Sequence, residues 1–215
     1  MSDREAFIRS QTRPLPVPSV PEITLYQADA VTPLWQMTQD DLARNELPPP
    51  FWAFPWAGGQ ALARYILDHP ECVRGKHVVD IASGSGLVAI AAAIAGAAQV
   101  TANDIDPYSG AAVALNAQLN GVAITFDGRD LLTGQPPEAG VFLAGDIAYE
   151  KAMSAAMLTF FSRAVSLGSI VYLGDPHRSY FPKGLRRCAD YDIVTTADIE
   201  DSEVKPATVW ALETI

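Results

Sequence analysis

Two patterns of apolar residues alternate along most of the chain: apolar positions at helical spacing, and short runs that are apolar throughout. The clearest unit spans residues 77–120, where an apolar run, a glycine-rich turn, an alanine-rich helical pattern and a second apolar run ending on Asp104 follow one another. Runs that are apolar throughout fit strands buried on both faces, as parallel sheets require. Further strands are predicted at residues 22–27, 123–126, 141–145, 169–174, 190–197 and 207–213. Further helices are predicted at residues 3–11, 34–45, 61–67, 109–120, 150–167 and 183–189.

The last two predicted strands have no helix between them, only about ten mostly polar residues. A parallel crossover usually carries a helix, so this pair is predicted to be an antiparallel hairpin that closes a parallel sheet.

The first fifty residues differ from the rest. A series of prolines between residues 14 and 21 is expected to exclude regular structure there. We therefore expect residues 1–50 to form an N-terminal extension packed on a single domain, residues 51–215.

Composition narrows the possible partners and compartments. The chain has 215 residues, 49% of them hydrophobic, and its formal net charge of −10 argues against a nucleic-acid partner, which clustered Lys and Arg would attract. Two isolated cysteines and scattered histidines suggest no disulfide scaffold and no metal site. No apolar signal core and no membrane-spanning run occur, so a cytoplasmic location without membrane contact is expected.

The glycine-rich turn Ser83-Gly84-Ser85-Gly86 is the first candidate for chemistry. Glycines let a backbone approach a ligand closely, and the helix that follows presents unpaired N–H groups to it. A carboxylate about twenty residues further on, Asp104, can accept hydrogen bonds from a ribose. This arrangement predicts a cofactor that contains adenosine, but it suits NAD and S-adenosylmethionine about equally.

Three features favour an adenosine cofactor with an amino-acid moiety. Asp80, inside the first apolar strand, would repel a pyrophosphate but attract an ammonium group. The closing hairpin is not needed in a dinucleotide fold, and acids cluster in residues 103–107, followed by Asn116 and Asn120. An NAD-type oxidoreductase remains the alternative.

Six segments of the chain together carry a resemblance to a known family: residues 51–62 (FWAFPWAGGQAL), 79–86, 102–107, 145–149, 174–176 and 209–210. In these segments the chain resembles the seven-strand, S-adenosylmethionine-dependent methyltransferases, and among them the lysine methyltransferases that modify the electron transfer flavoprotein β-subunit. The resemblance implies an α/β fold with a doubly wound, mostly parallel seven-stranded sheet and a C-terminal antiparallel hairpin. Two positions depart from the family pattern: Ala57, where members often have proline, and Ala148, where they often have phenylalanine.

The resemblance also implies roles for single residues. Asp146 and Tyr149 would be catalytic, holding an attacking amine by hydrogen bonds and helping its proton to leave. Asp104 would bind the ribose hydroxyls, Ile105 would flank the adenine and Asp130 would accept from the adenine amino group. The expected cofactor-binding residues are Trp56, Asp80, Ala82, Ser83, Gly84, Gly86, Asp104, Ile105 and Asp130.

Each of the three strand-end acids also has a purely structural explanation. Asp104 could cap the helix that follows it, and Asp130 could be an ordinary turn acid. Asp146 could be the N-cap of the helix predicted from residue 150.

Other segments are equally open. The aromatics Trp52, Phe54 and Trp56 could be core residues or could line a lysine channel. The acids between residues 198 and 203 could form a solvated loop or a docking site for a basic, lysine-bearing loop. Methylation of a ribosomal protein or a small molecule, and a non-catalytic binding module with this fold, remain alternatives to methylation of the flavoprotein β-subunit.

Overall fold

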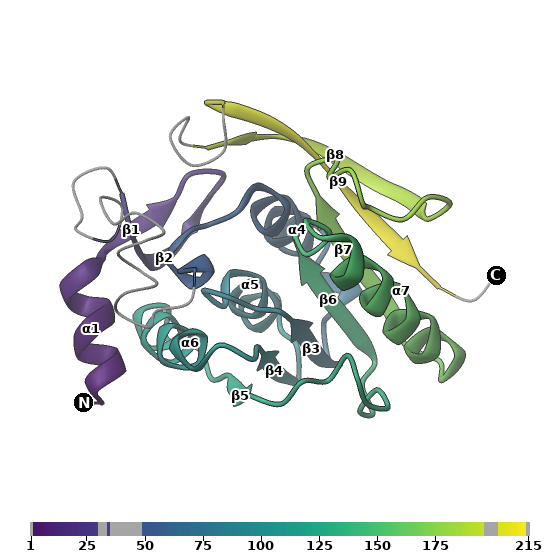
Figure 1. Ribbon diagram of the computed structural model, residues 1–215, viewed down its shortest axis with the longest axis horizontal. Helices are drawn as coiled ribbons and strands as arrows, with labels where there is room; N and C mark the ends of the chain where they lie inside the picture. Colours follow the sequence, from purple (N-terminus) through teal and green to yellow (C-terminus); the bar gives the residue numbers. More distant parts are fainter. Residues whose placement is uncertain (1, 30–33, 35–48, 196–201, 214–215) are drawn as a thin grey trace.

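The computed structural model describes residues 2–29, 34, 49–195 and 202–213. Seven strands in this part of the chain form one sheet (Figure 1). They are β3 (His77–Ile81), β4 (Gln99–Asn103), β5 (Thr125–Asp127), β6 (Val141–Gly145), β7 (Ile170–Asp175), β8 (Arg186–Val194) and β9 (Val204–Leu212). Their order is β5-β4-β3-β6-β7-β9-β8; the first five are parallel, and β9 pairs antiparallel with both β7 and β8. The predicted parallel sheet with a closing hairpin is confirmed.

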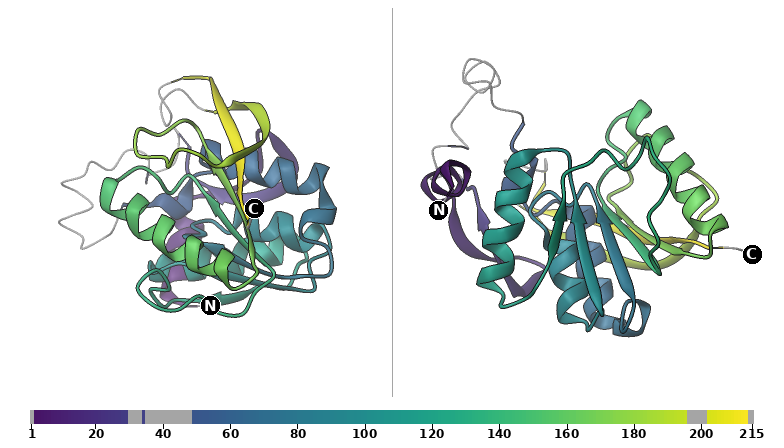
Figure 2. Two further views of the ribbon diagram at one scale, coloured as in Figure 1. Left: turned by 90° about the vertical axis from the view of Figure 1, so that its right-hand side faces the viewer. Right: turned by 90° about the horizontal axis from the view of Figure 1, so that it is seen from below.

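Helices cover both faces of the sheet, as a doubly wound fold requires. Alternate residues of a strand face opposite sides, and in β3 Val78 packs into one hydrophobic cluster while Val79 packs into another. The first cluster joins the sheet to α4 (Ala57–Asp68) and α5 (Leu87–Ile94), and the second joins it to α7 (Lys151–Ser166). Figure 2 shows α7 on the opposite side of the sheet from α4, α5 and α6 (Pro107–Leu119). Two short 3-10 helices, η1 (Phe51–Ala53) and η2 (Pro70–Cys72), flank α4.

The N-terminal residues contain more regular structure than predicted. Helix α1 (Asp3–Gln11) is confirmed, but the proline-rich stretch is not irregular: β1 (Arg13–Val17) pairs antiparallel with β2 (Val20–Gln27). Pro14 and Pro16 lie two residues apart in β1, so their nitrogens face the same side of the strand. In a two-stranded ribbon that side needs no ladder partner, which is why prolines are tolerated there.

Two asparagines of α6 fasten this N-terminal hairpin to the domain. Buried Asn116 accepts from the Tyr26 N–H at 2.8 Å and donates to the Ser85 carbonyl at 2.8 Å. Asn120 bonds to both the N–H and the carbonyl of Thr24, as a neighbouring strand would. The sequence prediction had grouped both asparagines with the acids of residues 103–107. Neither asparagine borders the cavity described below: both side chains bind β2, and Asn116 also fastens the glycine turn through Ser85.

A second correction concerns the predicted helix at residues 183–189. Gly184 has a φ of +87°, and Arg186 already begins strand β8, which pairs with β9 along its length. The hydrogen-bonded ladder with β9, a contact distant in sequence, outweighs the local helical pattern. The predicted helix at 34–45 lies outside the described residues except for Leu34, and so do most of the acids between 198 and 203. None of the described helices combines the length and the apolar character that crossing a bilayer requires.

Candidate active site

A cavity of about 920 Å³ opens at the carboxyl ends of the parallel strands, where α/β sheets bind ligands. The residues proposed from the sequence for the cofactor and the acceptor border this cavity, with one exception. Gly86 does not line it. Gly86 has a φ of +81° and begins α5, and a Cβ there would lie 3.1 Å from the Val113 side chain of α6. Its role is to shape the turn and let α5 approach α6.

The carboxylate of Asp104 ties the glycine turn to the end of β4. It accepts from the Gly84 N–H at 2.8 Å and from the Asp106 N–H at 2.9 Å. It does not cap the next helix: the N-cap of α6 is Asp106, whose side chain accepts from the Tyr108 N–H. Ile105 beside it is 71% exposed and borders the cavity. An acceptor group and an exposed apolar side chain thus lie side by side on the cavity wall.

Asp80 is buried at the bottom of the cavity, with 1% of its surface exposed. From the sequence we expected a carboxylate without a protein partner, but one oxygen accepts from the Ala89 N–H of α5 at 3.1 Å. Burial nevertheless raises the pKa of Asp80 well above its usual range. Nearby, the buried Ser83 hydroxyl has no hydrogen-bond partner among the described residues. Two buried polar groups therefore meet where a ligand with hydrogen-bond donors would find partners.

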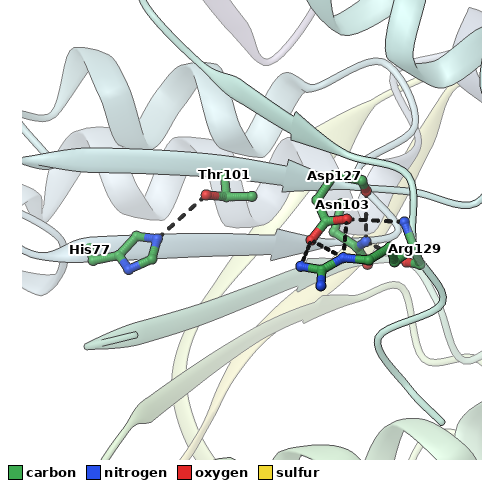
Figure 3. Close-up of polar contacts among 5 residues, drawn as sticks. All are labelled: His77, Thr101, Asn103, Asp127 and Arg129. Carbon is green, nitrogen blue, oxygen red and sulfur yellow. Dashed lines mark hydrogen bonds and ion pairs between the residues drawn. The ribbon is translucent and has the colours of Figure 1, made fainter. Parts of the chain in front are cut away.

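The loop after β5 is held against the end of β4 by Asn103 (Figure 3). The Asn103 amide donates to the carbonyl oxygens of Asp127 and Arg129, each at 2.8 Å. This brings Asp130 to the cavity wall, where its carboxylate also accepts from the Leu132 N–H at 3.1 Å. Asp130 is thus a turn acid and a cavity residue at once.

Asp146 follows β6 in a left-handed conformation, with a φ of +62°. Its side chain is 3% exposed, and its carboxylate accepts from the Gly58 N–H of α4 at 3.1 Å and from the Arg178 Nε at 2.7 Å. The helix that starts nearby, α7, has Glu150 at its N-cap, so Asp146 does not cap it. The carboxylate instead meets the N-terminus of α4, where a negative charge is favourable.

Sequence reasoning missed Arg178, which borders the cavity with 28% of its side chain exposed. Its backbone N–H donates at 2.8 Å to Asp175, the last residue of β7. Asp175 is 1% exposed, and its second oxygen is buried without a hydrogen-bond partner among the described residues. Burial is the main reason that the pKa of Asp175 rises to about 7, and the nearby charge of Asp146 adds to it. The only available signal was the position of Arg178 three residues after Asp175.

The aromatic segment before α4 divides between the core and the cavity. Trp52 is 2% exposed and packs in the core, where it stacks on Tyr108. Phe51 and Trp56 border the cavity with their ring centroids 5.9 Å apart, and Phe54 also reaches it. Tyr149 also borders the cavity, with its ring centroid 5.5 Å from that of Phe51, and burial raises its pKa. An aromatic wall therefore lies next to Asp146.

The charged residues that border the cavity, among those the structure describes, are nearly all acidic. Arg178 is the one basic residue among them, and it is ion-paired with Asp146. Such a lining favours a ligand with positive charge and disfavours a pyrophosphate. No group of three or more potential metal ligands occurs in the part of the chain that the structure describes. The acidic residues that border the cavity are Asp80, Asp104, Asp106, Asp130, Asp146 and Glu150.

Comparison with known proteins identifies the family. A Xenopus laevis protein named electron transfer flavoprotein beta subunit lysine methyltransferase is 34% identical over 218 aligned positions, which cover 97% of this chain and 86% of that protein. The chain belongs to the electron transfer flavoprotein β-subunit lysine methyltransferase family. The human member is 34% identical over 171 positions, covering 76% of this chain and 65% of the human protein. The family resemblance derived from the sequence is confirmed.

Two further comparisons agree with a methyltransferase fold. The model of the ribosomal protein L11 methyltransferase (PrmA) family matches residues 61–140, a segment that includes the glycine turn and Asp104 but ends before Asp146. The magnesium protoporphyrin IX methyltransferase of Synechocystis, crystallised with bound S-adenosylmethionine, superposes with a TM-score of 0.52 at 20% identity. That superposition covers 73% of the present chain and 78% of the Synechocystis chain.

Proposed function

We propose that this chain binds S-adenosylmethionine in the acidic cavity and transfers its methyl group to a lysine of the electron transfer flavoprotein β-subunit. The observation that carries the proposal is the 34% identity, over nearly the whole chain, to a Xenopus laevis protein whose name states this activity. The arrangement of the cavity supports each half of the proposal separately.

One group of the residues that line the cavity fits the cofactor. Asp104 would hold the ribose hydroxyls, and exposed Ile105 would pack on the adenine with Asp130 near its amino group. The unpartnered Ser83 hydroxyl and the buried Asp80 carboxylate would meet the amino-acid moiety. The ammonium of that moiety would be a positively charged partner for the Asp80 carboxylate, whereas the negative charge of a pyrophosphate would be repelled by it. This preference is the reason to favour S-adenosylmethionine over NAD.

A second group of lining residues, around Asp146, fits an amine acceptor. S-adenosylmethionine, when bound, supplies a methyl group on a positively charged sulfonium. Asp146 and Tyr149 would accept hydrogen bonds from the lysine nitrogen and fix its direction of approach, which is how positioning lowers the barrier of a displacement reaction. The rings of Phe51 and Trp56 would pack along the aliphatic part of the lysine. Asp146 is held by Gly58 and Arg178, so orientation rather than strong basicity is its expected contribution.

The substrate is the part of the proposal that needs the most direct test. The match to the ribosomal protein L11 methyltransferase model makes a ribosomal protein the second candidate, but that match covers only the cofactor-binding half of the site. The experiment incubates the enzyme with labelled S-adenosylmethionine and either purified electron transfer flavoprotein or purified ribosomal protein L11. Label in a lysine of the flavoprotein β-subunit is expected, and label in L11 alone would contradict the proposal.

One variant tests the role of Asp146, and one titration tests the identity of the cofactor. Asp146→Ala is expected to abolish transfer while S-adenosylhomocysteine still binds, and unchanged turnover would refute the assignment. A thermal titration separates the cofactors: S-adenosylhomocysteine should raise the melting temperature and NAD should not.

A further inference from the structure

The cavity contains an ion pair at Asp146, where a carboxylate alone could bind an amine. Arg178 donates from Nε to one oxygen of Asp146 at 2.7 Å, while the other oxygen accepts from the Gly58 N–H at 3.1 Å. Each carboxylate oxygen can accept more than one hydrogen bond, so an amine can still bind to this pair. The following inference rests on the proposed function, because it concerns the amine that Asp146 would receive.

An isolated carboxylate is a poor partner for a lysine that must be methylated. Opposite charges stabilise each other, so Asp146 alone would favour the ammonium form of the lysine. The transfer forms a bond between the lysine nitrogen and the methyl carbon while the carbon–sulfur bond breaks and its electron pair stays on sulfur. An ammonium has no lone pair for this bond, so it must first lose a proton to water. A lone Asp146 would therefore bind lysine tightly in its unreactive form.

We propose that Arg178 cancels the charge of Asp146, so that the acceptor lysine binds beside Asp146 as the free amine rather than as the ammonium. The Asp146–Arg178 pair is neutral overall, yet its carboxylate still accepts hydrogen bonds and orients the nitrogen. Arg178 is thus a positioning residue that acts through Asp146. A guanidinium suits this role because it stays charged at every relevant pH.

The chain fixes Arg178 in this place by a short turn after β7. The Asp175 carboxylate accepts from the Arg178 backbone N–H at 2.8 Å, and His177 between them has a φ of +64°. Because Gly145 of β6 pairs with Gly174 of β7, Asp175 and Asp146 follow neighbouring positions at the same edge of the sheet. The turn therefore directs the Arg178 side chain toward Asp146.

Other charged groups near Asp146 must be separated from this effect. Asp175 at the end of β7 interacts with Asp146, while Tyr149 and Glu150 follow Asp146 in the chain and border the same cavity. The Asp175→Asn variant removes the titration of that carboxyl and keeps an acceptor for the Arg178 N–H. In a profile of kcat against pH, the acid limb is the fall in kcat toward acidic pH. This limb should persist in Asp175→Asn. Its disappearance there would assign the limb to Asp175 and overturn the inference.

The main experiment measures kcat and KM for the flavoprotein β-subunit from acidic to alkaline pH in wild type, Arg178→Met and Arg178→Lys. Arg178→Met should displace the acid limb upward by about one pH unit or more, so that kcat near neutral pH falls about tenfold and recovers at high pH. KM should not rise, because Asp146 still attracts the ammonium. Arg178→Lys keeps the charge and should leave the limb near its wild-type position.

Two further variants make the test specific. In Asp146→Asn/Arg178→Met both charges are absent, so the acid limb in the pH profile of the remaining activity should return toward the wild-type pH. Asparagine is chosen because it tolerates the left-handed conformation at position 146. Arg187→Met removes an exposed arginine that pairs with Asp190 on β8, and its profile should match wild type. Substrate binding in the presence of S-adenosylhomocysteine, measured for the same variants, requires no turnover: Arg178→Met should bind at least as tightly as wild type at neutral pH.

The possible failures can be told apart. If Arg178→Met loses binding and turnover equally at every pH, Arg178 is merely structural and the inference is wrong. An unmoved limb in Arg178→Met, with wild-type enzyme active, would also contradict the inference alone. If the wild-type enzyme methylates no protein lysine, the proposed function itself fails.

Discussion

The two glycines at the start of α4 should respond in opposite ways to alanine. A Cβ on Gly58 would lie 2.5 Å from the Gly174 carbonyl oxygen and 2.9 Å from the Asp146 nitrogen, both of them backbone atoms. Reaching an ordinary contact of about 3.5 Å would require α4 to move roughly 1 Å away from β7. A Cβ on Gly59 would meet only the Leu87 and Val88 side chains, at 3.9 and 4.0 Å, which is ordinary contact.

The magnitude follows from these contacts. Overpacking costs about 1–3 kcal/mol, and losing the Gly58 hydrogen bond to the Asp146 carboxylate costs about 1.5–3 kcal/mol. Alanine gains up to about 1 kcal/mol in helix propensity. Gly58→Ala should therefore lower the free energy of unfolding by about 1.5–5 kcal/mol, whereas Gly59→Ala should leave it unchanged or raise it by up to about 1 kcal/mol.

Urea and thermal unfolding of both variants beside wild type measure this difference. For a chain of this length, Gly58→Ala should lower Tm by roughly 3–20 °C. It should also reduce methyl transfer, because Asp146 loses the group that fixes one of its oxygens. Wild-type stability in Gly58→Ala, or an equal loss in Gly59→Ala, would refute the inference that close backbone contact at Gly58 positions the acceptor site.

Variants at three other carboxylates, Asp175, Asp80 and Asp106, test each of them separately. Asp175 has a pKa of about 7 against an ordinary value of 3.8, so its protonated form stabilises the fold fully below about pH 3.8, and this stabilisation is lost as the pH rises through 7. The Tm of Asp175→Asn should therefore rise relative to that of wild type between pH 4 and 7. A Tm difference that stays constant over this range would contradict the assignment. Burial raises the pKa of Asp80, so cofactor binding should release a proton, and calorimetry in buffers of different ionisation enthalpy should show this release in wild type but not in Asp80→Asn. Asp106→Ala removes the N-cap of α6 and should cost about 1 kcal/mol in urea unfolding, a loss that Asp106→Ser should largely avoid.

Strand and helix patterns in the sequence predicted the sheet well where burial alone decides structure. The strands β6 and β7 are apolar runs buried on both faces, and both were predicted within a residue or two of their ends. The prediction failed where pairing with a strand elsewhere in the sequence determines the local structure. Prolines in β1 are accommodated because β2 pairs with only one side of that strand, and residues 186–189 are strand because β9 pairs with them.

The candidate site shows the same division. The acids that the sequence places at the ends of strands border one cavity, because the carboxyl ends of parallel strands meet at one edge of the sheet. Their partners were not predictable: Gly58 lies 88 residues before Asp146 in the sequence, and Arg178 lies 32 residues after it. No local pattern indicates which carboxylate an arginine will pair with once the chain has folded.

Identifying the methyl acceptor in a complete protein mixture would decide between the candidate substrates. The enzyme and its Asp146→Ala variant are incubated with labelled S-adenosylmethionine and a cell extract, and labelled species are identified by mass spectrometry. The proposed function predicts one predominant labelled protein, the electron transfer flavoprotein β-subunit, with methylated lysine, and no label with the variant. Label confined to small molecules, or to a ribosomal protein, would contradict it.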